Sequence, residues 1–257
     1  MYSKLSLTDK VAVVLGGTSG IGKAIALGFA DAGASVVPAS RRQEQVDATA
    51  ADIEAKGRRT LRATGDVDDR ASLQKLHDRV TTEFGRVDIL VNSAGRTKRV
   101  PTLEMTEDDW NAILNTNLTG TLRSCQIFGK GMIARGYGRI INIGSLASFV
   151  SLHETSAYSA SKAGVAMLTK SLGCEWCKYG VNVNAIAPGV FRTPLNTALL
   201  DGTERGREFK LRTPMGRFGQ VEELVGAAIF LASESASYVT GEILVVDGGL
   251  LASGVNQ

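Results

Sequence analysis

A tyrosine and a lysine four residues apart, Tyr158 and Lys162, form the pair in this sequence best suited to proton transfer. Residues at this spacing share one face of a helix. A phenol with a pKa of about 10 is a poor base at neutral pH, but an ammonium about 4 Å away stabilises the phenolate by about 4 kcal/mol at an effective dielectric constant of about 20, or roughly three pKa units. Such pairs also occur by chance on helix surfaces, so the interpretation depends on other residues.

Two further residues could complete a site for a carbonyl or alcohol oxygen. Ser145 follows an apolar run at 139–143, and its hydroxyl could hold a substrate oxygen and stabilise charge that develops there; a turn or cap residue is the alternative. Asn117 falls within a helical pattern, where asparagine is a mediocre helix former, which indicates a specific role. His153 could hydrogen-bond a polar substrate or could simply lie on the surface.

A glycine-rich turn near the start of the chain predicts a nucleotide-binding site. Its glycines follow the apolar run Val11–Leu15 and open a helical pattern at 21–31. Glycine lets the backbone approach a pyrophosphate closely, and a helix N-terminus offers free N–H groups and a positive partial charge, although glycines also serve tight turns that need positive φ. We expect the cofactor contacts of this turn to be Gly16, Thr18, Ser19, Gly20 and Ile21.

The end of the second apolar run, Ser35–Ala39, indicates which dinucleotide is bound. An enzyme that prefers NAD usually has a carboxylate here for the ribose 2′-hydroxyl, and this chain has none. Instead, Ser40 can hydrogen-bond a 2′-phosphate and Arg41 or Arg42 can pair with it in a bidentate manner. Arginines that only start a helix are the alternative, which the positive end of the helix dipole disfavours. The sequence therefore favours NADP(H).

Two other stretches are placed to contact the cofactor. Asp66, with Val67 beside it, could accept from the adenine amino group or could merely cap the next helix. Small residues at the end of a later strand would let the backbone lie along the cofactor, and the expected contacts there are Asn92, Ala94 and Gly95.

Apolar runs alternate with amphipathic helical stretches along the whole chain. This pattern predicts a single Rossmann-type α/β domain over 1–257, with a doubly wound parallel sheet of about seven strands and helices on both faces. A segment too long for an ordinary connection follows the sixth strand and predicts a substrate lid at about 190–212. The expected strands are Val11–Leu15, Ser35–Ala39, 60–64, 87–91, 139–143, 181–187 and Ile243–Val246, and the expected helices are 21–31, 43–56, 69–84, 106–134 with a break, 155–179 and 221–232.

Composition argues against several classes of protein. A net charge of +3 and 6% aromatic residues do not suit nucleic-acid binding. The sequence offers no apolar run long enough to cross a bilayer and no apolar signal core, so we expect a cytoplasmic protein without a membrane partner. Cys174 and Cys177 form a C-x-x-C inside a helical pattern, and with only His77 and His153 in the chain we expect no metal site.

In order and spacing, the glycine turn, the run 92–95, Asn117, Ser145, the Tyr-x-x-x-Lys pair and the run 184–189 resemble the short-chain dehydrogenase/reductase family over essentially the whole chain. The resemblance implies that Tyr158 is the general acid/base and that Lys162 lowers its pKa and binds the nicotinamide ribose. It further implies that Ser145 orients the substrate oxygen and that Asn117 holds a water in a proton relay. The residues implied to close on the nicotinamide carboxamide are Pro188, Gly189, Val190 and Thr193.

Two departures from the family pattern are mild: Leu15 replaces a threonine and Ser93 replaces an asparagine. The runs 190–195 and 214–219 resemble bacterial 3-oxoacyl-carrier-protein reductases and gluconate 5-dehydrogenase-like enzymes. The resemblance implies a homotetramer that interconverts a ketone and a secondary alcohol. A catalytically silent nucleotide sensor is a remote alternative, because such a protein is expected to lose Tyr158 or Lys162. The basic residues that could bind either a phosphopantetheine arm or a sugar carboxylate are Arg96, Lys98 and Arg99.

Overall fold

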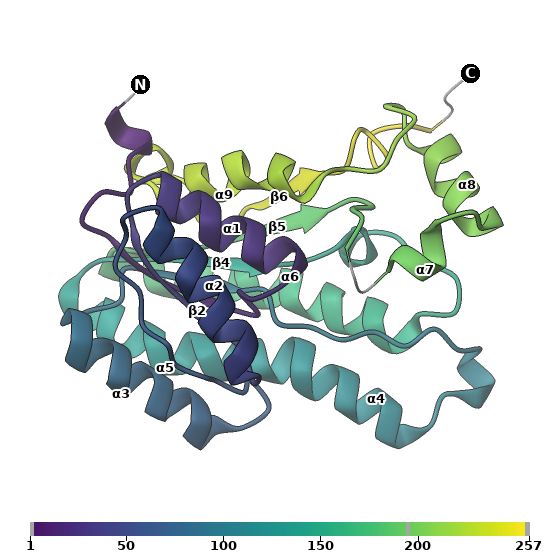
Figure 1. The fold of residues 1–257 in the computed structure, drawn as a ribbon. Helices are drawn as coiled ribbons and strands as arrows, with labels where there is room; N and C mark the ends of the chain where they lie inside the picture. Colours follow the sequence, from purple (N-terminus) through teal and green to yellow (C-terminus); the bar gives the residue numbers. More distant parts are fainter. Residues whose placement is uncertain (1–2, 194–195, 255–257) are drawn as a thin grey trace.

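One parallel sheet forms the centre of the molecule (Figure 1). The computed structural model describes residues 3–193 and 196–254. Apolar, largely β-branched residues make these strands, and nearly all are buried except in the last strand, as expected for a sheet covered on both faces. Among the described residues the strands, in the spatial order β2-β1-β3-β4-β5-β6, are β1 (Val11–Leu15), β2 (Ser35–Ala39), β3 (Ile89–Asn92), β4 (Gly138–Ile143), β5 (Val181–Pro188) and β6 (Ile243–Val246).

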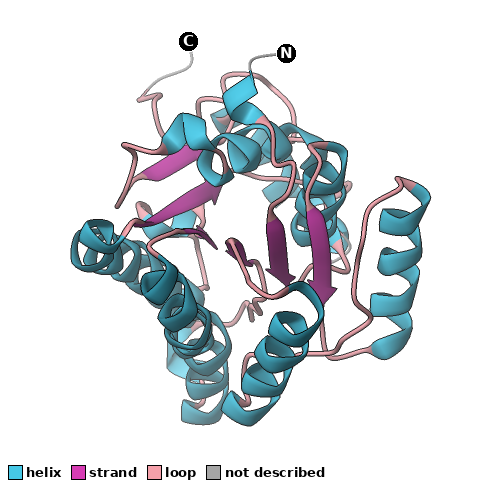
Figure 2. Cartoon of the chain, turned by 90° about the vertical axis from the view of Figure 1, so that its left-hand side faces the viewer, coloured by secondary structure: helices cyan, strands magenta, loops and turns pink. Residues whose placement is uncertain are grey.

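Helices cover the sheet on both faces (Figure 2). Alternation along β1 divides the core: Ala12 and Val14 pack with α1, α2 and α9, whereas Val13 and Leu15 pack with α3, α5 and α6. Burial of each large apolar side chain contributes about 1.5–3 kcal/mol. The helices are α1 (Gly20–Asp31), α2 (Gln43–Ala55), α3 (Arg70–Phe84), α4 (Glu107–Leu114), α5 (Gly120–Arg135), α6 (Ser156–Trp176), α7 (Thr197–Leu200), α8 (Glu204–Arg212) and α9 (Val225–Ala232).

The stretch 60–64, predicted as a strand, is not one, so the described sheet has six strands rather than seven. The N–H of Val36 in β2 donates a hydrogen bond to Arg59 O (3.1 Å). The next backbone hydrogen bond between the two segments is the one from Gly65 N–H to Ser40 O (3.0 Å). In a parallel ladder, alternate residues donate to the same neighbour, so the donor after Val36 should be Pro38, which has no N–H. The ladder cannot continue, and β2 remains the edge of the sheet.

The break predicted within 106–134 is a π-helical turn, Asn115–Thr119, between α4 and α5. Here the N–H of Gly120 reaches back to Asn115 O, five residues earlier, so the turn contains one residue more than an α-helical turn. Such turns are frequent at functional sites. Its position brings Asn117 under the carboxyl edge of the sheet.

The long segment after β5 contains two short helices, α7 and α8, which the sequence pattern did not predict. Thr203 caps α8 by accepting a hydrogen bond from Gly206 N–H (3.0 Å). The two helices lie together beyond the carboxyl end of β5 (Figure 1). Pro194 and Leu195, which belong to the predicted lid, are outside the described residues. Within the described part of the chain, no helix combines the length and apolar character needed to span a membrane.

The strand order creates the place where a ligand can bind. β1 lies between β2 and β3, so the chain leaves β1 first to one side and later to the other. At such a reversal the loops after β1 and β3 diverge and leave a crevice at the carboxyl edge. The glycine turn follows β1 and Ser93 follows β3, so the fold places both at this crevice.

Candidate active site

A cleft of about 990 Å³ opens at the carboxyl edge of the sheet. Two predicted site residues, Asn92 and Asn117, do not line it and lie behind its wall. The predicted residues that do line it are Gly16, Thr18, Ser19, Gly20, Ile21, Ser40, Arg41, Arg42, Asp66, Val67, Ala94, Gly95, Ser145, Tyr158, Lys162, Pro188, Gly189, Val190 and Thr193. The fold thus brings residues from widely separated parts of the chain to one cavity.

The glycine turn has room only for backbone, as a pyrophosphate site requires. Gly16 has φ +75°, and a Cβ there would lie 2.7 Å from Ala94 N. A Cβ on Gly22 would lie 2.2 Å from Gly16 O. Ser19 caps α1 without a side-chain hydrogen bond, so the first N–H groups of the helix are available to a ligand. The turn therefore fits the phosphates of a dinucleotide.

The adenosine side of the cleft is cationic. Arg41 and Arg42 are exposed, and neither forms an ion pair within the described chain. Ser40 is half-buried between them and the glycine turn, and its hydroxyl makes only a long 3.5 Å bond to Arg42 O. These groups remain available to a phosphate, which two guanidinium forks and a hydroxyl suit well.

Asp66 lines the cleft and is not the cap of the helix that follows. The N-cap of α3 is Asp69, whose carboxylate accepts from Ala71 N–H (2.8 Å). Asp66 instead accepts from Asp68 N–H (3.0 Å) and is itself held by Ser72 through its backbone N–H (3.0 Å). The Asp66 carboxylate thus keeps acceptor capacity toward the cleft.

Asn92 contributes its side chain to the core rather than to the cleft, and the backbone contact with the cofactor predicted for it stays a prediction. Its amide donates to Asn142 Oδ1 (2.8 Å) and accepts from Ser124 Oγ (2.6 Å). Asn142 in turn donates to Thr169 of α6 (2.9 Å). A strand residue alternates between faces, and this one points to the buried side. The network fixes β3 and β4 relative to α5 and α6.

Asn117 holds the loop after β3 against α6. Its amide exchanges two hydrogen bonds with the backbone of Arg96, at 2.8 and 2.9 Å, and also donates to Ser161 Oγ (2.9 Å). Its backbone oxygen accepts from Thr121 Oγ1 (2.8 Å). Both amide hydrogens are donated and the amide oxygen accepts one bond, so the side chain holds the cleft wall without lining the cavity.

Hydroxyl groups fix Ser145 relative to α6. Ser148 Oγ accepts from the Ser145 N–H (3.3 Å) and donates to Lys162 O (2.9 Å). The Ser145 hydroxyl accepts from Ala147 N–H (3.1 Å) and opens a short helical turn. The Lys162 ammonium donates to Ile143 O (2.7 Å), at the last residue of β4.

The electrostatics of Tyr158 differ from the sequence prediction. Burial raises the pKa of the Tyr158 phenol, and a hydrogen bond with Ser145 opposes this rise. Burial also lowers the pKa of Lys162 to about 8. The Lys162 ammonium lies 5.7 Å from the centre of the Tyr158 ring and is bonded to Ile143 O, so its field does not dominate the phenol. Without a ligand, the site holds Tyr158 in its protonated form at neutral pH.

The lowered pKa of Lys162 predicts a pH-dependent stability. Between pH 8 and 10.5 the unfolded lysine carries a proton that the folded one has lost, so stability should rise with pH across this window. At about 1.4 kcal/mol per pKa unit, the rise is at most about 3 kcal/mol. Urea unfolding of wild type and Lys162→Met at pH 7.5 and 9.5 measures it, with exposed Lys170→Met as control. A pH dependence that persists unchanged in Lys162→Met would contradict this.

The outer part of the cleft contains residues that the sequence analysis did not single out. Of the basic cluster after Gly95, Arg96 and Arg99 line the cavity, whereas Lys98 is paired with Asp109 outside it. The unusual length of the segment after β5 predicted that it would cover the cleft, but the sequence pattern did not indicate which of its residues would line the cavity. Additional lining residues are Leu152, Thr155, Phe191, Asn196, Leu200, Arg205 and Phe209.

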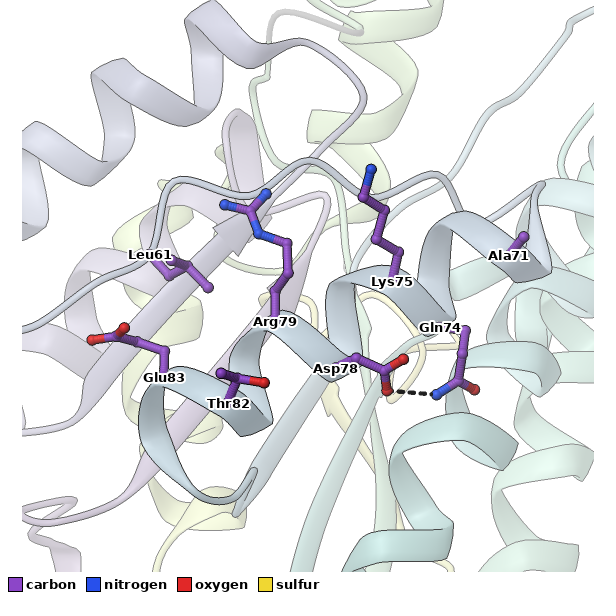
Figure 3. A pocket seen from close by; sticks show the side chains of 8 residues that line it. All are labelled: Leu61, Ala71, Gln74, Lys75, Asp78, Arg79, Thr82 and Glu83. Atoms are coloured by element: carbon purple, nitrogen blue, oxygen red, sulfur yellow. Dashed lines mark hydrogen bonds between the residues drawn. The ribbon is translucent and has the colours of Figure 1, made fainter.

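A second hollow lies along the outside of α3, beside Leu61 (Figure 3). Its lining side chains are mostly polar and charged, including Lys75, Arg79 and Glu83. Gln74 donates to Asp78 (2.8 Å), an i,i+4 contact typical of a solvated helix face. The site therefore remains the cleft at the carboxyl edge.

Known proteins resemble this chain along nearly its full length. A family model described as enoyl-(acyl carrier protein) reductase matches residues 16–251. A D-threitol dehydrogenase from Mycolicibacterium smegmatis is 43% identical over 243 residues, which cover 95% of this chain and 93% of that protein. A 2-dehydro-3-deoxy-D-gluconate 5-dehydrogenase from Escherichia coli is 41% identical over 253 residues, or 98% of this chain and 99% of that protein.

Solved structures agree with this relationship. A gluconate 5-dehydrogenase from Burkholderia cenocepacia J2315, in complex with NADP and tartrate, superposes with a TM-score of 0.94 at 40% identity. The match covers 97% of this chain and 98% of that one. The extent of these matches, together with the cleft that gathers the glycine turn, Ser145, Tyr158 and Lys162, shows that the chain is an oxidoreductase belonging to the short-chain dehydrogenase/reductase family.

Proposed function

We propose that this protein is an NADP(H)-dependent dehydrogenase that interconverts a secondary alcohol and a ketone on a sugar acid. The observation that carries the reaction type is that Ser145, Tyr158 and the buried Lys162 line one cleft, with Ser145 near enough to the Tyr158 phenol to lower its pKa. Two arginines at the outer end of the same cleft, Arg96 and Arg99, suit an acidic substrate. Relatives that act on sugar acids and polyols support this choice of substrate class.

Each side chain of this group has its own role in the proposed reaction. The nicotinamide, when bound, supplies or accepts the hydride. Tyr158 holds the proton that passes between its phenol oxygen and the substrate oxygen, and Ser145 hydrogen-bonds that same oxygen. Lys162 provides a positive charge near the phenol, which stabilises the Tyr158 phenolate that would accept the proton of the alcohol in the oxidative direction. Because burial favours the protonated phenol, the resting site is ready for the reductive direction.

NADP(H) would be held by the parts of the cleft already described. The N–H groups at the start of α1 would hold the pyrophosphate, and Gly16 and Gly22 leave space for it. Ser40, Arg41 and Arg42 would hold the 2′-phosphate. The Asp66 carboxylate can accept from the adenine amino group, and the residues of the segment from Pro188 to Thr193 can close on the nicotinamide.

A 3-oxoacyl-thioester reductase is the second candidate. Arg96 favours it, because this exposed arginine at the cleft mouth has no carboxylate partner within the described chain and could contact the phosphate of a phosphopantetheine arm. Arg99 is different, since this exposed arginine is already ion-paired with Glu154 (2.8 Å).

We further propose a cytoplasmic homotetramer. Met167 on α6 is 62% exposed although it is apolar, as expected for a helix face covered by another subunit. Cys125, Cys174 and Cys177 all carry free thiols, which suits a reducing compartment. Light scattering of the purified protein at several concentrations tests the assembly.

A substrate panel tests the proposed activity. We expect NADP⁺ reduction with D-gluconate or a related sugar acid, at least about tenfold faster in kcat/KM than the reaction of an acetoacetyl thioester with NADPH. The measurement is the absorbance of NADPH, with Tyr158→Phe as the control for contaminating enzymes. Binding of NADPH without turnover of any alcohol, sugar acid, ketone or thioester would support the nucleotide-sensor alternative instead.

A further inference from the structure

The lid helix α8 directs an arginine into the cleft. Arg205 lies in the first turn of α8 and lines the cavity together with Arg99. Its guanidinium carbon lies 5.3 Å from the centre of the Phe209 ring, which also lines the cavity. Stacking on an aromatic ring orients the guanidinium but does not neutralise its charge.

Arg205 lacks a carboxylate of its own. Within the described chain it forms no ion pair, and its hydrogen bond is a long one, from Nη1 to His153 O (3.5 Å). Neighbouring cations on α8 differ: Arg212 is paired with Glu208 (2.9 Å), and Arg207 is exposed outside the cleft. Arg205 is thus a partly buried cation whose guanidinium has further N–H donors available for a ligand.

Arg99, in the loop after β3, lines the same cavity. Its Nε lies 2.8 Å from Glu154 Oε2, and the other oxygen of Glu154 lies 3.3 Å from His153 Nε2. Glu154 has φ +61°, an uncommon backbone conformation for a residue with a side chain, and its carbonyl accepts from Val100 N–H (2.9 Å). The two loops that carry Arg99 and Glu154 are therefore fixed together before any ligand arrives.

The charges around this space do not balance. Burial lowers the pKa of Arg205, and the nearby charge of Arg99 lowers it further, whereas Glu208 and Glu154 act in the opposite direction. Glu154 is ion-paired with Arg99 and Glu208 with Arg212, so with Arg205 three guanidinium groups have only two carboxylates among them. A ligand carboxylate placed between Arg99 and Arg205 would relieve the repulsion and complete the hydrogen bonds of both forks.

We propose that Arg205, together with Arg99, forms the subsite that holds the carboxylate of the substrate, and that Arg205 is a specificity-determining residue. This inference rests on the proposed function and deepens it, because it assigns selection of acids over neutral polyols to a residue on α8. Since one fork is on the lid and the other is on the fixed wall, a bound carboxylate joins α8 to the body of the molecule. A neutral polyol lacks the group that makes this link.

Paired substrates test the subsite. Full-length wild type, Arg205→Ala, Arg205→Lys and the control Arg207→Ala are compared with NADP⁺ and either D-gluconate or D-threitol. For Arg205→Ala we expect kcat/KM for gluconate to fall about 10- to 100-fold, mainly through KM, with threitol changed less than about threefold. Arg205→Lys should recover part of the loss, because it restores the charge but not the fork. Arg207→Ala should match wild type.

A binding measurement separates this inference from the proposed function. Calorimetric titration of gluconate into the NADP⁺ complex reports on the subsite even if turnover is absent, and thermal unfolding checks that each variant is folded. Weaker gluconate binding in folded Arg205→Ala than in Arg207→Ala supports the subsite. Equal loss for gluconate and threitol, equal gluconate binding by the two variants, or wild type that binds gluconate no better than threitol would overturn it. Absence of turnover with intact, Arg205-dependent binding would instead count against the proposed function alone.

Discussion

Tyr158→Phe should lower kcat by about 10²- to 10⁴-fold while the dissociation constant for NADPH changes less than about threefold. The substitution removes only the phenolic hydroxyl, which is the proposed source of the proton, and general acid/base groups contribute about this much. Tyr158 lines the cleft together with Ser145, and its ring remains available to pack in the variant. Steady-state kinetics in both directions and NADPH fluorescence titration measure the two quantities.

Tyr179→Phe is the matched control, because this tyrosine is 45% exposed beyond the end of α6 and does not line the cleft. It should retain wild-type turnover. If Tyr158→Phe kept more than about a tenth of wild-type kcat in both directions, another group would have to supply the proton. Loss of NADPH binding in the same variant would point to a structural role for the hydroxyl.

The double substitution Ser40→Asp with Arg41→Gln should reverse the cofactor preference. Removing a guanidinium bond to a phosphate costs about 1.5–3 kcal/mol, and the new carboxylate repels the 2′-phosphate while it can accept from the 2′-hydroxyl of NADH. The ratio of kcat/KM for NADPH to that for NADH should therefore fall about 10²- to 10³-fold. The measurement uses one ketone substrate with both cofactors.

Arg58→Gln provides the comparison for net charge, since Arg58 is exposed past the end of α2 and lies outside the cleft. This variant should leave the cofactor ratio unchanged. A double variant that still prefers NADPH by the wild-type factor would mean that the 2′-phosphate is held elsewhere, with Arg42 as the next residue to replace.

Local sequence patterns were sufficient for most of the fold but not for one edge of the sheet. β1, β2 and β6 coincide with their predicted ranges, because apolar β-branched runs next to glycine turns are strong signals. The stretch 60–64 contains an arginine and two threonines and is less apolar, and its pairing depends on a donor that Pro38 of another strand lacks. The helices α7 and α8 were missed because α7 has only four residues and α8 only nine, most of them polar or charged, so neither gives a long periodic apolar pattern.

The same distinction holds for the site. Residue types and spacing located the cleft, since strand ends of a parallel sheet meet at one edge. They could not show that the Asn92 side chain points into the core, nor that the Asn117 amide is hydrogen-bonded to the backbone of Arg96. The sequence also predicted the wrong direction for the Tyr158 pKa in the ligand-free site, because burial raises this pKa. Burial is a property of the folded surroundings, and the sequence does not fix the distance between Lys162 and the phenol.

The π-helical turn at Asn115–Thr119 means that α4 and α5 do not share one continuous periodicity. One additional residue rotates everything after it by about 100° relative to an ordinary helix. The face that α4 presents and the face that α5 presents are therefore set independently on either side of Asn117, although no loop separates them. Insertions and deletions near this point would be felt as a rotation of α5 against the sheet, so the length of this segment is constrained more tightly than its composition.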